Sequence, residues 1–418
     1  MRIAVVGAGV AGTATAWELS KAGHQVTVFE KAGGIAEGAS FASTGWIGKA
    51  GLTGWHSTSP QWPKTGPYGL TTETSWWRQP GGLRWLARSK KAQSDAGSAE
   101  LMALGLALAN LTGMRLRDSS LHSGADVERS QGVMMVFRSA DGVSACESGR
   151  QRLDQLSIKV SELDAASAKK LEPGLSDDLT PHMRWWLPED EVINGRQWLN
   201  FLKTDAMRHG CAFEMHSNVT AIQSDGKLYV QGAKHPAAAS AQFDATVVCT
   251  GHHAQELLGP LGLKLPLLNM NQCALSAQIR EPHLAPVSGL FDATRRISIF
   301  RTGQRLKVSS SQGIWPGQSP EPVYNQLYQV LNDWFPGSAR LHGVQSCTQT
   351  WQTTNTFTPD GMPLVGPTKC PGVWLNTGYG STGWTHAPGV AHLLASSFAK
   401  SGQHDSALLG KLNVNRFD

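Results

Sequence analysis

The sequence predicts a mixed α/β protein that begins with a dinucleotide-binding unit, and the opening residues carry most of this prediction. An apolar run at 3–6 is typical of a strand. Three glycines follow it in the G-x-G-x-x-G spacing: Gly7, Gly9 and Gly12. A helical stretch and a second strand, 26–29, come next, and this strand stops at Glu30. The order of strand, glycine turn, helix, strand and acidic residue is typical of a Rossmann-like unit.

Each residue type in this unit has a physical role in holding a dinucleotide. Gly7 allows the tight turn, Gly9 lets a pyrophosphate approach the backbone, and Gly12 lets the helix pack close to the strand. The first helical amides, at Val10 and Ala11, point toward the phosphates at the positive end of the helix dipole.

The acidic residue at the end of the second strand, Glu30, can accept hydrogen bonds from ribose hydroxyls. The alternative is a structural glycine turn in an α/β protein, and this alternative leaves Glu30 unexplained. We therefore expect a dinucleotide cofactor on the opening unit.

Length and composition narrow the classes of protein that fit. With 418 residues the chain is too long for one ordinary core, so we expect two domains. The net charge of +5, without a long basic block or zinc-finger spacing, predicts no nucleic-acid partner. The six cysteines are scattered without a C-x-x-C pair, which predicts buried thiols in a reducing compartment and no metal site. No segment has the roughly 20 apolar residues of a membrane span, so we expect a soluble, cytoplasmic protein.

Tryptophan is frequent in this chain, with 15 residues, and the segment 75–91 combines several of them with arginines and lysines. A basic, aromatic helix can lie on an anionic membrane surface, which would place the protein at the periphery of the inner membrane. The alternative is a helix that packs its aromatic side chains inward and leaves a solvated basic face. We favour the inward-packed helix and leave the peripheral contact open.

The rest of the chain alternates helices and strands without an internal repeat. Apolar spacing near 3.6 predicts helices at four ranges: 98–117, 163–173, 196–210 and 322–334. Apolar or alternating runs predict strands at six ranges: 132–137, 212–215, 219–223, 245–249, 297–301 and 305–311. A last strand within 372–378 runs into a glycine loop, and a helix follows from about Pro388, a residue suited to a first helical turn.

Three separated segments can converge on one cofactor. They are the opening unit, the region of Val219, Thr250 and Gly251, and the glycine loop at 376–389. A glycine loop at a helix N-terminus presents amides to an anion or a polar carbonyl. A reduced flavin gathers negative charge at N1 and the C2 carbonyl, so we expect the last loop to face a flavin. The alternative is an ordinary C-terminal glycine loop.

With these motifs in place, the chain resembles the glycine oxidase and D-amino-acid oxidase superfamily of FAD enzymes, most closely the bacterial D-amino-acid dehydrogenase small subunits. The matching stretches are the opening fingerprint, the loop at 38–45, the run at 297–308, and T-P-D-G-M-P-L-V-G with the final glycine loop. The resemblance implies a discontinuous Rossmann-like FAD-binding domain (α/β) and a substrate domain (α+β) built on an antiparallel sheet. The FAD-binding ranges would be 1–65, 193–262 and 350–418, and the substrate ranges 66–192 and 263–349.

The resemblance also implies roles for individual residues. The ADP half of a non-covalently bound FAD would contact Gly7, Gly9, Val10, Ala11, Gly12, Glu30 and Lys31. Ser40 would line the phosphates and flavin, the backbone of Val219 would lie near the adenine, and Thr250 and Gly251 would lie beside the cofactor. The flavin ring and ribityl chain would face Gly380, Ser381, Thr382, Gly383, Trp384 and Thr385.

The implied chemistry is oxidation of a C–N bond of a small amine or amino acid, with hydride transfer to flavin N5. Orientation, a dry flavin face and a substrate clamp suffice for this reaction, and no strong side-chain base is needed. The sequence leaves open whether oxygen or a quinone accepts the electrons. It also leaves open a secondary-amine oxidase of the sarcosine or glycine type, and a flavin-binding protein with altered or lost catalysis.

The chain departs from the family pattern at the substrate end. Asn355 stands where relatives commonly have an arginine that grips the substrate carboxylate as a bidentate fork. Ser309–Ser310 replace a glycine pair, Tyr379 replaces a histidine, and Gln272–Cys273 replace a Gly-Tyr pair. Because the cofactor motif is nearly intact while the clamp is missing, we expect an atypical substrate.

Other residues are candidates for the substrate site. Arg301 matches a basic position common in the family, and Arg295 and Arg296 are alternatives for the missing clamp; for each one taken singly we favour a surface or structural ion-pairing arginine. Trp384, Trp46 and His56 complete the candidate set; the alternatives for the last two are a core tryptophan and a surface histidine.

Overall fold

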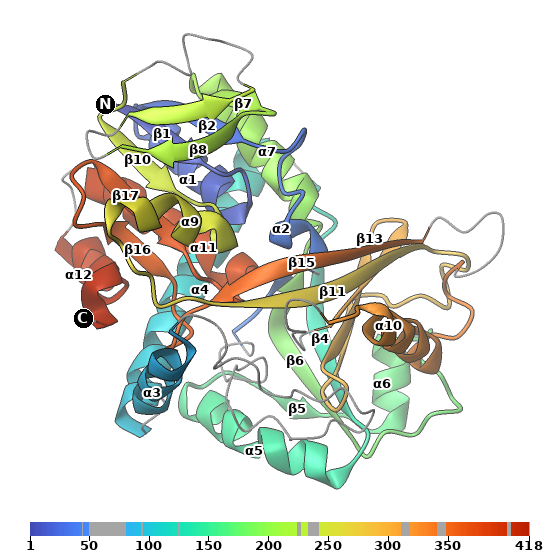
Figure 1. Cartoon of the computed structure of the whole chain (residues 1–418). Helices are drawn as coiled ribbons and strands as arrows, with labels where there is room; N and C mark the ends of the chain where they lie inside the picture. Colours follow the sequence, from blue (N-terminus) through green and yellow to red (C-terminus); the bar gives the residue numbers. More distant parts are fainter. Residues whose placement is uncertain are drawn as a thin grey trace.

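A computed structural model describes residues 1–43, 45–49, 81–92, 95–123, 126–223, 227–232, 242–310, 318–340, 348–398 and 403–417. In these ranges the chain forms two main β-sheets with helices around them (Figure 1). The fold class predicted from the sequence, a Rossmann-like part and a part built on a largely antiparallel sheet, is confirmed.

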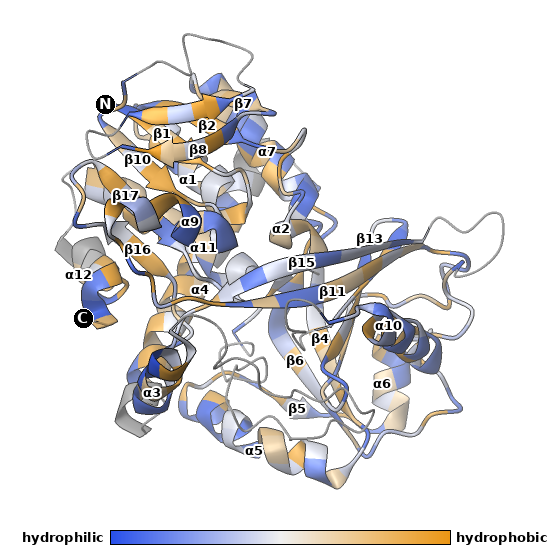
Figure 2. Cartoon of the chain, in the orientation of Figure 1, coloured by the Kyte–Doolittle hydropathy of each residue, from blue (hydrophilic) through white to orange (hydrophobic). Residues whose placement is uncertain are grey.

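The first sheet has six strands in the order β16-β17-β10-β1-β2-β7, and only β16 runs antiparallel to its neighbour. Its strands are β1 (Arg2–Val6), β2 (Gln25–Glu30), β7 (Ala212–Met215), β10 (Ala245–Val248), β16 (Leu364–Pro367) and β17 (Val373–Thr377). Strands β1 and β10 are almost wholly apolar because helices or loops cover both faces (Figure 2).

Four helices pack together beside this sheet and share its core. They are α1 (Val10–Lys21), α4 (Asp95–Ser123), α7 (Gly195–Arg208) and α11 (Gly383–Phe398). Helix α1 packs against α11 and α7, and α11 also packs against α4. This packing holds the N-termini of α1 and α11 at the same end of the sheet, where the carboxyl ends of β1, β10 and β17 lie.

The second sheet has nine strands, eight of them in the order β15-β11-β14-β13-β12-β4-β6-β3, with β5 paired to β6. Its strands are β3 (Trp46–Ile47), β4 (Ser130–Phe137), β5 (Ser161–Glu162), β6 (Met183–Val192), β11 (Leu268–Gln278), β12 (Gly289–Asp292), β13 (Ile297–Thr302), β14 (Arg305–Ser310) and β15 (Gln349–Phe357). All pairs are antiparallel except β12 with β4.

Helix α10 (Glu321–Trp334) packs against β11, β13 and β14, with a buried apolar stripe that includes Leu327 and Trp334. Further elements are α2 (Ala39–Ala42), α3 (Gly82–Ala92), α5 (Ala140–Gln155), α6 (Ala165–Leu171), α9 (Ala254–Leu258), α12 (Gln403–Lys411), η3 (Gly251–His253), η4 (Gly259–Leu261) and η5 (Val414–Phe417). Strands β8 (Asn218–Ile222) and β9 (Leu228–Gln231) form a separate hairpin.

The structure differs from the sequence expectations in three places. Strand β15, assigned to the FAD-binding ranges, pairs with β11 in the second sheet, and the pairing runs along the whole of β15. Helix α4, assigned to the substrate ranges, packs on α11 because its buried face carries Leu104 and Leu108. Helix α11 begins at Gly383, so Pro388 lies inside the helix and not at its start.

The basic, aromatic segment 75–91 is described from residue 81 onward. Trp85 is buried against Leu268 and Met270, and its indole N–H donates to the carbonyl of Phe357 at 3.1 Å. This is the inward packing favoured from the sequence, whereas Leu83 on the same helix is 69% exposed. Among the helices that the structure describes, none is long and apolar enough to cross a membrane.

Candidate active site

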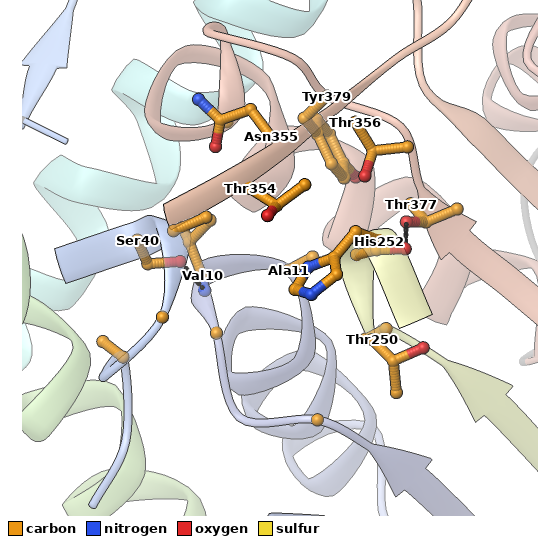
Figure 3. A pocket seen from close by; sticks show the side chains of 18 of the residues that line it. Val10, Ala11, Ser40, Thr250, His252, Thr354, Asn355, Thr356, Thr377 and Tyr379 are labelled. Carbon is orange, nitrogen blue, oxygen red and sulfur yellow. Dashed lines mark hydrogen bonds between the residues drawn. The ribbon is translucent and has the colours of Figure 1, made fainter. Parts of the chain in front are cut away.

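A cavity of about 770 Å³ lies where the first sheet meets the second (Figure 3). Its lining comes from the turn after β1, the loop around α2, the start of η3, strand β15 and the loop before α11. The convergence of three separated segments predicted from the sequence is therefore present in the fold.

Backbone geometry explains two of the glycines in the first turn. Gly7 has φ +98°, and a Cβ there would lie 2.8 Å from the carbonyl oxygen of Cys249. A Cβ on Gly12 would lie only 1.8 Å from the carbonyl oxygen of Gly7. Both positions need glycine, because the turn has φ > 0 at one and packs backbone against backbone at the other.

The N-terminus of α1 is capped from outside its own segment. Gly9 precedes the helix and has no side chain, and the hydroxyl of Ser40 accepts the hydrogen bond of the Val10 amide at 2.9 Å. A Cβ on Gly9 would lie 3.1 Å from the same hydroxyl. The positive end of the helix dipole, the Ser40 hydroxyl and an open backbone therefore face the cavity together.

Glu30 is tied to the turn that it follows. Its two carboxylate oxygens accept the amides of Ala8 at 2.7 Å and Ala32 at 2.9 Å. Each oxygen keeps a lone pair for a further donor, and Glu30 lines the cavity. These bonds hold the carboxylate at the end of β2, where a ribose would reach it.

Next to Glu30 in the sequence, Lys31 begins a chain of hydrogen bonds that runs through His253 to Glu256. The Lys31 Nζ lies 2.7 Å from Nε2 of His253, whose Nδ1 lies 2.8 Å from a carboxylate oxygen of Glu256. Because an ammonium can only donate, Nε2 accepts and Nδ1–H donates to Glu256. The adjacent His252 lines the cavity. Burial is the largest cause that lowers the pKa of His252, to about 4, and the nearby His253 and Lys31 lower it further. His252 is therefore neutral at pH 7.

The glycine loop before α11 is held by buried hydrogen bonds. The Gly380 amide, at φ +53°, donates to the carbonyl of Thr356 at 2.8 Å. The Tyr379 hydroxyl donates to Oδ1 of Asn376, whose Nδ2 donates to Oγ1 of Thr15 in α1 at 3.0 Å. The loop is thus fixed to both α1 and β15, and it places the first turn of α11 at the cavity.

Uncharged side chains form the wall that the second sheet contributes. Asn355 is 8% exposed and donates a hydrogen bond from Nδ2 to Oε1 of Gln272. Trp46 packs against Phe291 and Phe300, and its indole N–H donates to Asp190 at 2.9 Å. The described cavity residues from this sheet are all neutral: Trp46, Gln272, Ser298, Ser309, Thr354, Asn355 and Thr356.

Comparison with known proteins identifies the family. Residues 2–397 match the family described as FAD dependent oxidoreductase. The chain is 30% identical to a D-amino acid dehydrogenase of Vibrio vulnificus over 94% of this chain and 95% of that protein. It is 28% identical to a D-amino acid dehydrogenase of Rhizorhabdus wittichii over the full length of both.

The chain belongs to the FAD-dependent oxidoreductase family. Solved structures agree in fold: glycine oxidase from Bacillus cereus has a TM-score of 0.70 at 15% identity and covers 96% of both chains. Glycine oxidase from Geobacillus kaustophilus has a TM-score of 0.69 at 20% identity and covers 99% of both. The resemblance stated from the sequence is confirmed.

The cavity fits the cofactor of this FAD-dependent family. The glycine turn leaves space that side chains would fill, and the α1 terminus supplies donors for a pyrophosphate. Two buried polar atoms in the lining, Oγ1 of Thr250 and Nε1 of Trp384, have no hydrogen-bond partner among the described residues. Buried polar atoms are normally paired, so these two indicate a polar ligand in the cavity.

Most site residues predicted from the sequence line this one cavity. The predicted cofactor residues among them are Gly7, Gly9, Val10, Ala11, Glu30, Lys31, Ser40, Val219, Thr250, Gly251, Gly380, Ser381, Thr382, Gly383, Trp384 and Thr385. The predicted substrate residues Asn355, Tyr379 and Trp46 line it as well. Gly12 lies behind the lining against Gly7, and His56 lies outside the described residues.

The arginines suggested as a replacement clamp are not in this lining. Ser298 on β13 faces the cavity, and Arg301 lies three residues further along the same strand. Because side chains alternate between the two faces of a strand, Arg301 lies on the opposite face. Its Nε donates a hydrogen bond to the Gly303 carbonyl there, at 3.1 Å. Arg295 and Arg296 lie in the turn before β13, and the Arg295 amide donates to Asp292 at 2.9 Å. None of these three arginines is therefore among the described residues that line the cavity.

The sequence reasoning missed several lining residues. They are His252, Ser298, Thr354 and Thr356, whereas Gln272 and Ser309 were noted as departures from the family pattern but were not assigned to the site. Alternation along β15 does not identify these residues, because Thr354, Asn355 and Thr356 are consecutive and all three line the cavity. No local signal separates His252 from a surface histidine, because its position depends on where η3 begins.

Proposed function

We propose that this protein oxidises the C–N bond of a small amine or amino acid, with an atypical substrate. The observation that carries the proposal is that one cavity is lined both by the residues expected to bind FAD and by the uncharged wall that contains Asn355. The relatives named D-amino acid dehydrogenase support the reaction class. The absence of a cation at position 355 supports a departure from their substrate.

Different residues of the cavity would bind different parts of the cofactor. The α1 terminus and Ser40 would hold the pyrophosphate, Glu30 would hold the ribose, and the residues from Gly380 to Thr385 would face the ring. FAD supplies the two-electron acceptor when bound. We propose non-covalent binding; acid precipitation should release all the flavin to the supernatant, and flavin retained in the pellet would contradict it.

The protein's contribution to the chemistry is orientation and exclusion of water. Trp46, backed by Phe291 and Phe300, offers an apolar wall, and Asn355 offers a fixed polar contact. The substrate amine would bind neutral and would lose its α-hydrogen and two electrons, after which water hydrolyses the imine. Such a site needs no side-chain base, since pre-organised geometry lowers the barrier.

An anaerobic titration tests this proposal. The purified protein should be yellow, and a panel of D-amino acids, N-alkyl amino acids and amines should be added without oxygen. Bleaching of the visible flavin band by at least one amine is expected, and preference for N-alkyl compounds would favour a secondary-amine oxidase. A stable yellow protein that no amine reduces would instead favour a flavin-binding role without catalysis.

We further propose a quinone acceptor reached through a peripheral membrane contact at helix α3. Its exposed face carries Arg84, Lys90 and Lys91 next to the exposed Leu83. Basic residues beside an apolar side chain favour anionic lipid surfaces. Co-sedimentation with anionic vesicles but not with neutral ones is expected, and Lys90→Glu with Lys91→Glu should abolish it. Oxygen consumption at the rate of amine oxidation would contradict the quinone.

A further inference from the structure

The orientation of two side-chain amides in the cavity wall follows from one backbone group. The carbonyl of Ser310 can only accept a hydrogen bond, and it receives one from the side-chain amide of Gln272. The Gln272 nitrogen therefore points toward Ser310, where it also lies 3.2 Å from Oγ of Ser309. The oxygen Oε1 of Gln272 must then point the other way, toward Asn355.

This orientation determines what Asn355 presents to the cavity. Because Oε1 of Gln272 is an acceptor, Asn355 turns its nitrogen to it and donates one of its two N–H groups. The remaining N–H and the oxygen Oδ1 have no partner among the described residues, and Asn355 lines the cavity (Figure 3). A ligand therefore meets one donor and one acceptor side by side.

A free carboxylate fits this pair poorly. Its oxygens only accept, so one of them would face the lone pairs of Oδ1. The described second-sheet lining supplies no positive charge, because the charged lining residues, Glu30, Lys31, Glu37 and Glu256, belong to the nucleotide end. A buried anion without a partner is strongly disfavoured.

A carboxamide has the complementary pattern. We propose that Asn355, oriented by Gln272, recognises an uncharged carboxamide next to the reacting amine, so that the substrate class is α-amino amides; this rests on the proposed amine oxidation. The carboxamide N–H donates to Oδ1 and its carbonyl accepts the free N–H of Asn355. The carboxamide does not react: the α C–H bond breaks with transfer of a hydride to FAD, one amine N–H bond breaks with release of its proton to solvent, and a C=N bond forms.

Binding can be measured separately from oxidation. Two analogues without an α-hydrogen, 2-amino-2-methylpropanamide and 2-aminoisobutyric acid, are titrated into the FAD-loaded protein, with calorimetry and flavin absorbance as readouts. The amide should bind at least about tenfold more tightly than the acid, the difference expected for one or two hydrogen bonds. Equal affinity, tighter binding of the acid, or no binding of the amide would overturn the inference.

Variants test the role of the amide pair. Asn355→Asp removes both N–H donors and adds a charge, so the amide affinity should fall at least about tenfold. Gln272→Leu leaves Asn355 without its orienting acceptor and should reduce the preference for the amide over the acid. Gln352→Glu makes the same amide-to-acid change at an exposed position of β15 outside the lining and should leave both affinities unchanged. If either cavity variant fails to fold, the wild-type comparison still decides.

Failure of this inference differs from failure of the proposed function. If free amino acids reduce the flavin and bind better than their amides, the substrate class is wrong while amine oxidation stands. If the protein carries no FAD, or if no amine or amide reduces it, the proposed function itself is wrong.

Discussion

The hydroxyl of Ser40 accepts the backbone amide of Val10 at 2.9 Å, across thirty positions of sequence. The bond joins α2 to the first turn of α1, so the pyrophosphate end of the cavity depends on both segments. Ser40→Ala should destabilise the protein by about 1 kcal/mol, as for loss of a helix cap, and should weaken FAD binding. Chemical denaturation and a flavin-binding titration measure the two effects.

Ser139 offers a matched control for this change, because its hydroxyl caps α5 by accepting the Gly142 amide at 3.3 Å. Ser139→Ala should have a similar effect on unfolding and none on FAD affinity. Equal FAD affinity in the wild type and Ser40→Ala would contradict a role for this hydroxyl at the cofactor.

Gly12 is predicted to tolerate no side chain. A Cβ there would lie 1.8 Å from the carbonyl oxygen of Gly7, so Gly12→Ala must displace the first turn. We expect loss of bound FAD, measured by the visible spectrum, and a lower midpoint of thermal unfolding. Gly410→Ala is the control, since nothing lies within 4 Å of that Cβ and alanine is the better helix former. A Gly12→Ala protein with full FAD content would contradict the close packing.

The Tyr379 hydroxyl is predicted to hold the final glycine loop. Burial raises its pKa well above the ordinary value, so the group stays protonated as the donor to Asn376. Tyr379→Phe leaves a buried amide oxygen unsatisfied and should lower the free energy of unfolding by about 1–3 kcal/mol. Tyr229→Phe, at a tyrosine 46% exposed in β9, should change it by less than about 0.5 kcal/mol. Equal effects would show that the buried contact is unimportant.

Stability is predicted to fall in mild acid because of His386. The side chain is fully buried, and burial lowers its pKa from 6.5 to about 4, with a smaller opposing effect of the Gly105 backbone. The folded pKa lies below the unfolded one, so the stabilisation is complete above pH 6.5 and is lost as the pH falls toward 4. Between pH 7 and pH 5 the loss should be about 2 kcal/mol.

Urea unfolding at pH 7 and pH 5 measures this loss, and His386→Leu should reduce it. His252, whose pKa is lowered in the same direction, should leave some pH dependence in that variant. An unchanged loss in His386→Leu would contradict the assignment.

The cofactor half of the site could be predicted from sequence because its chemistry is local. Gly7 to Glu30 lie within one βαβ unit, where spacing alone specifies strand, turn and helix. The substrate half could be predicted only in part: Asn355, Tyr379 and Trp46 line the cavity as expected, but the contacts around them depend on strand pairing between distant segments. Asn355 meets Gln272 only through the β11–β15 register, and nothing local to either residue reveals it.

The same reason explains where the structure differs from the sequence expectations. The arginines near β13 were plausible by type, but the face of a strand residue depends on register, and Arg301 falls on the face opposite Ser298. Helix α4 carries too little amphipathic pattern to show that α11 is its partner. In both cases, long-range packing determines the position of the residue or helix, and the local sequence pattern does not specify it.

The most direct test of the account is the rate of anaerobic flavin reduction by a matched pair, D-alaninamide and D-alanine, in the wild type and in Asn355→Arg. The account predicts that the wild type is reduced faster by the amide, and that the arginine, which grips carboxylates as a fork, reverses the preference. The account is contradicted if D-alanine is the better reductant of the wild type, whatever the effect of Asn355→Arg.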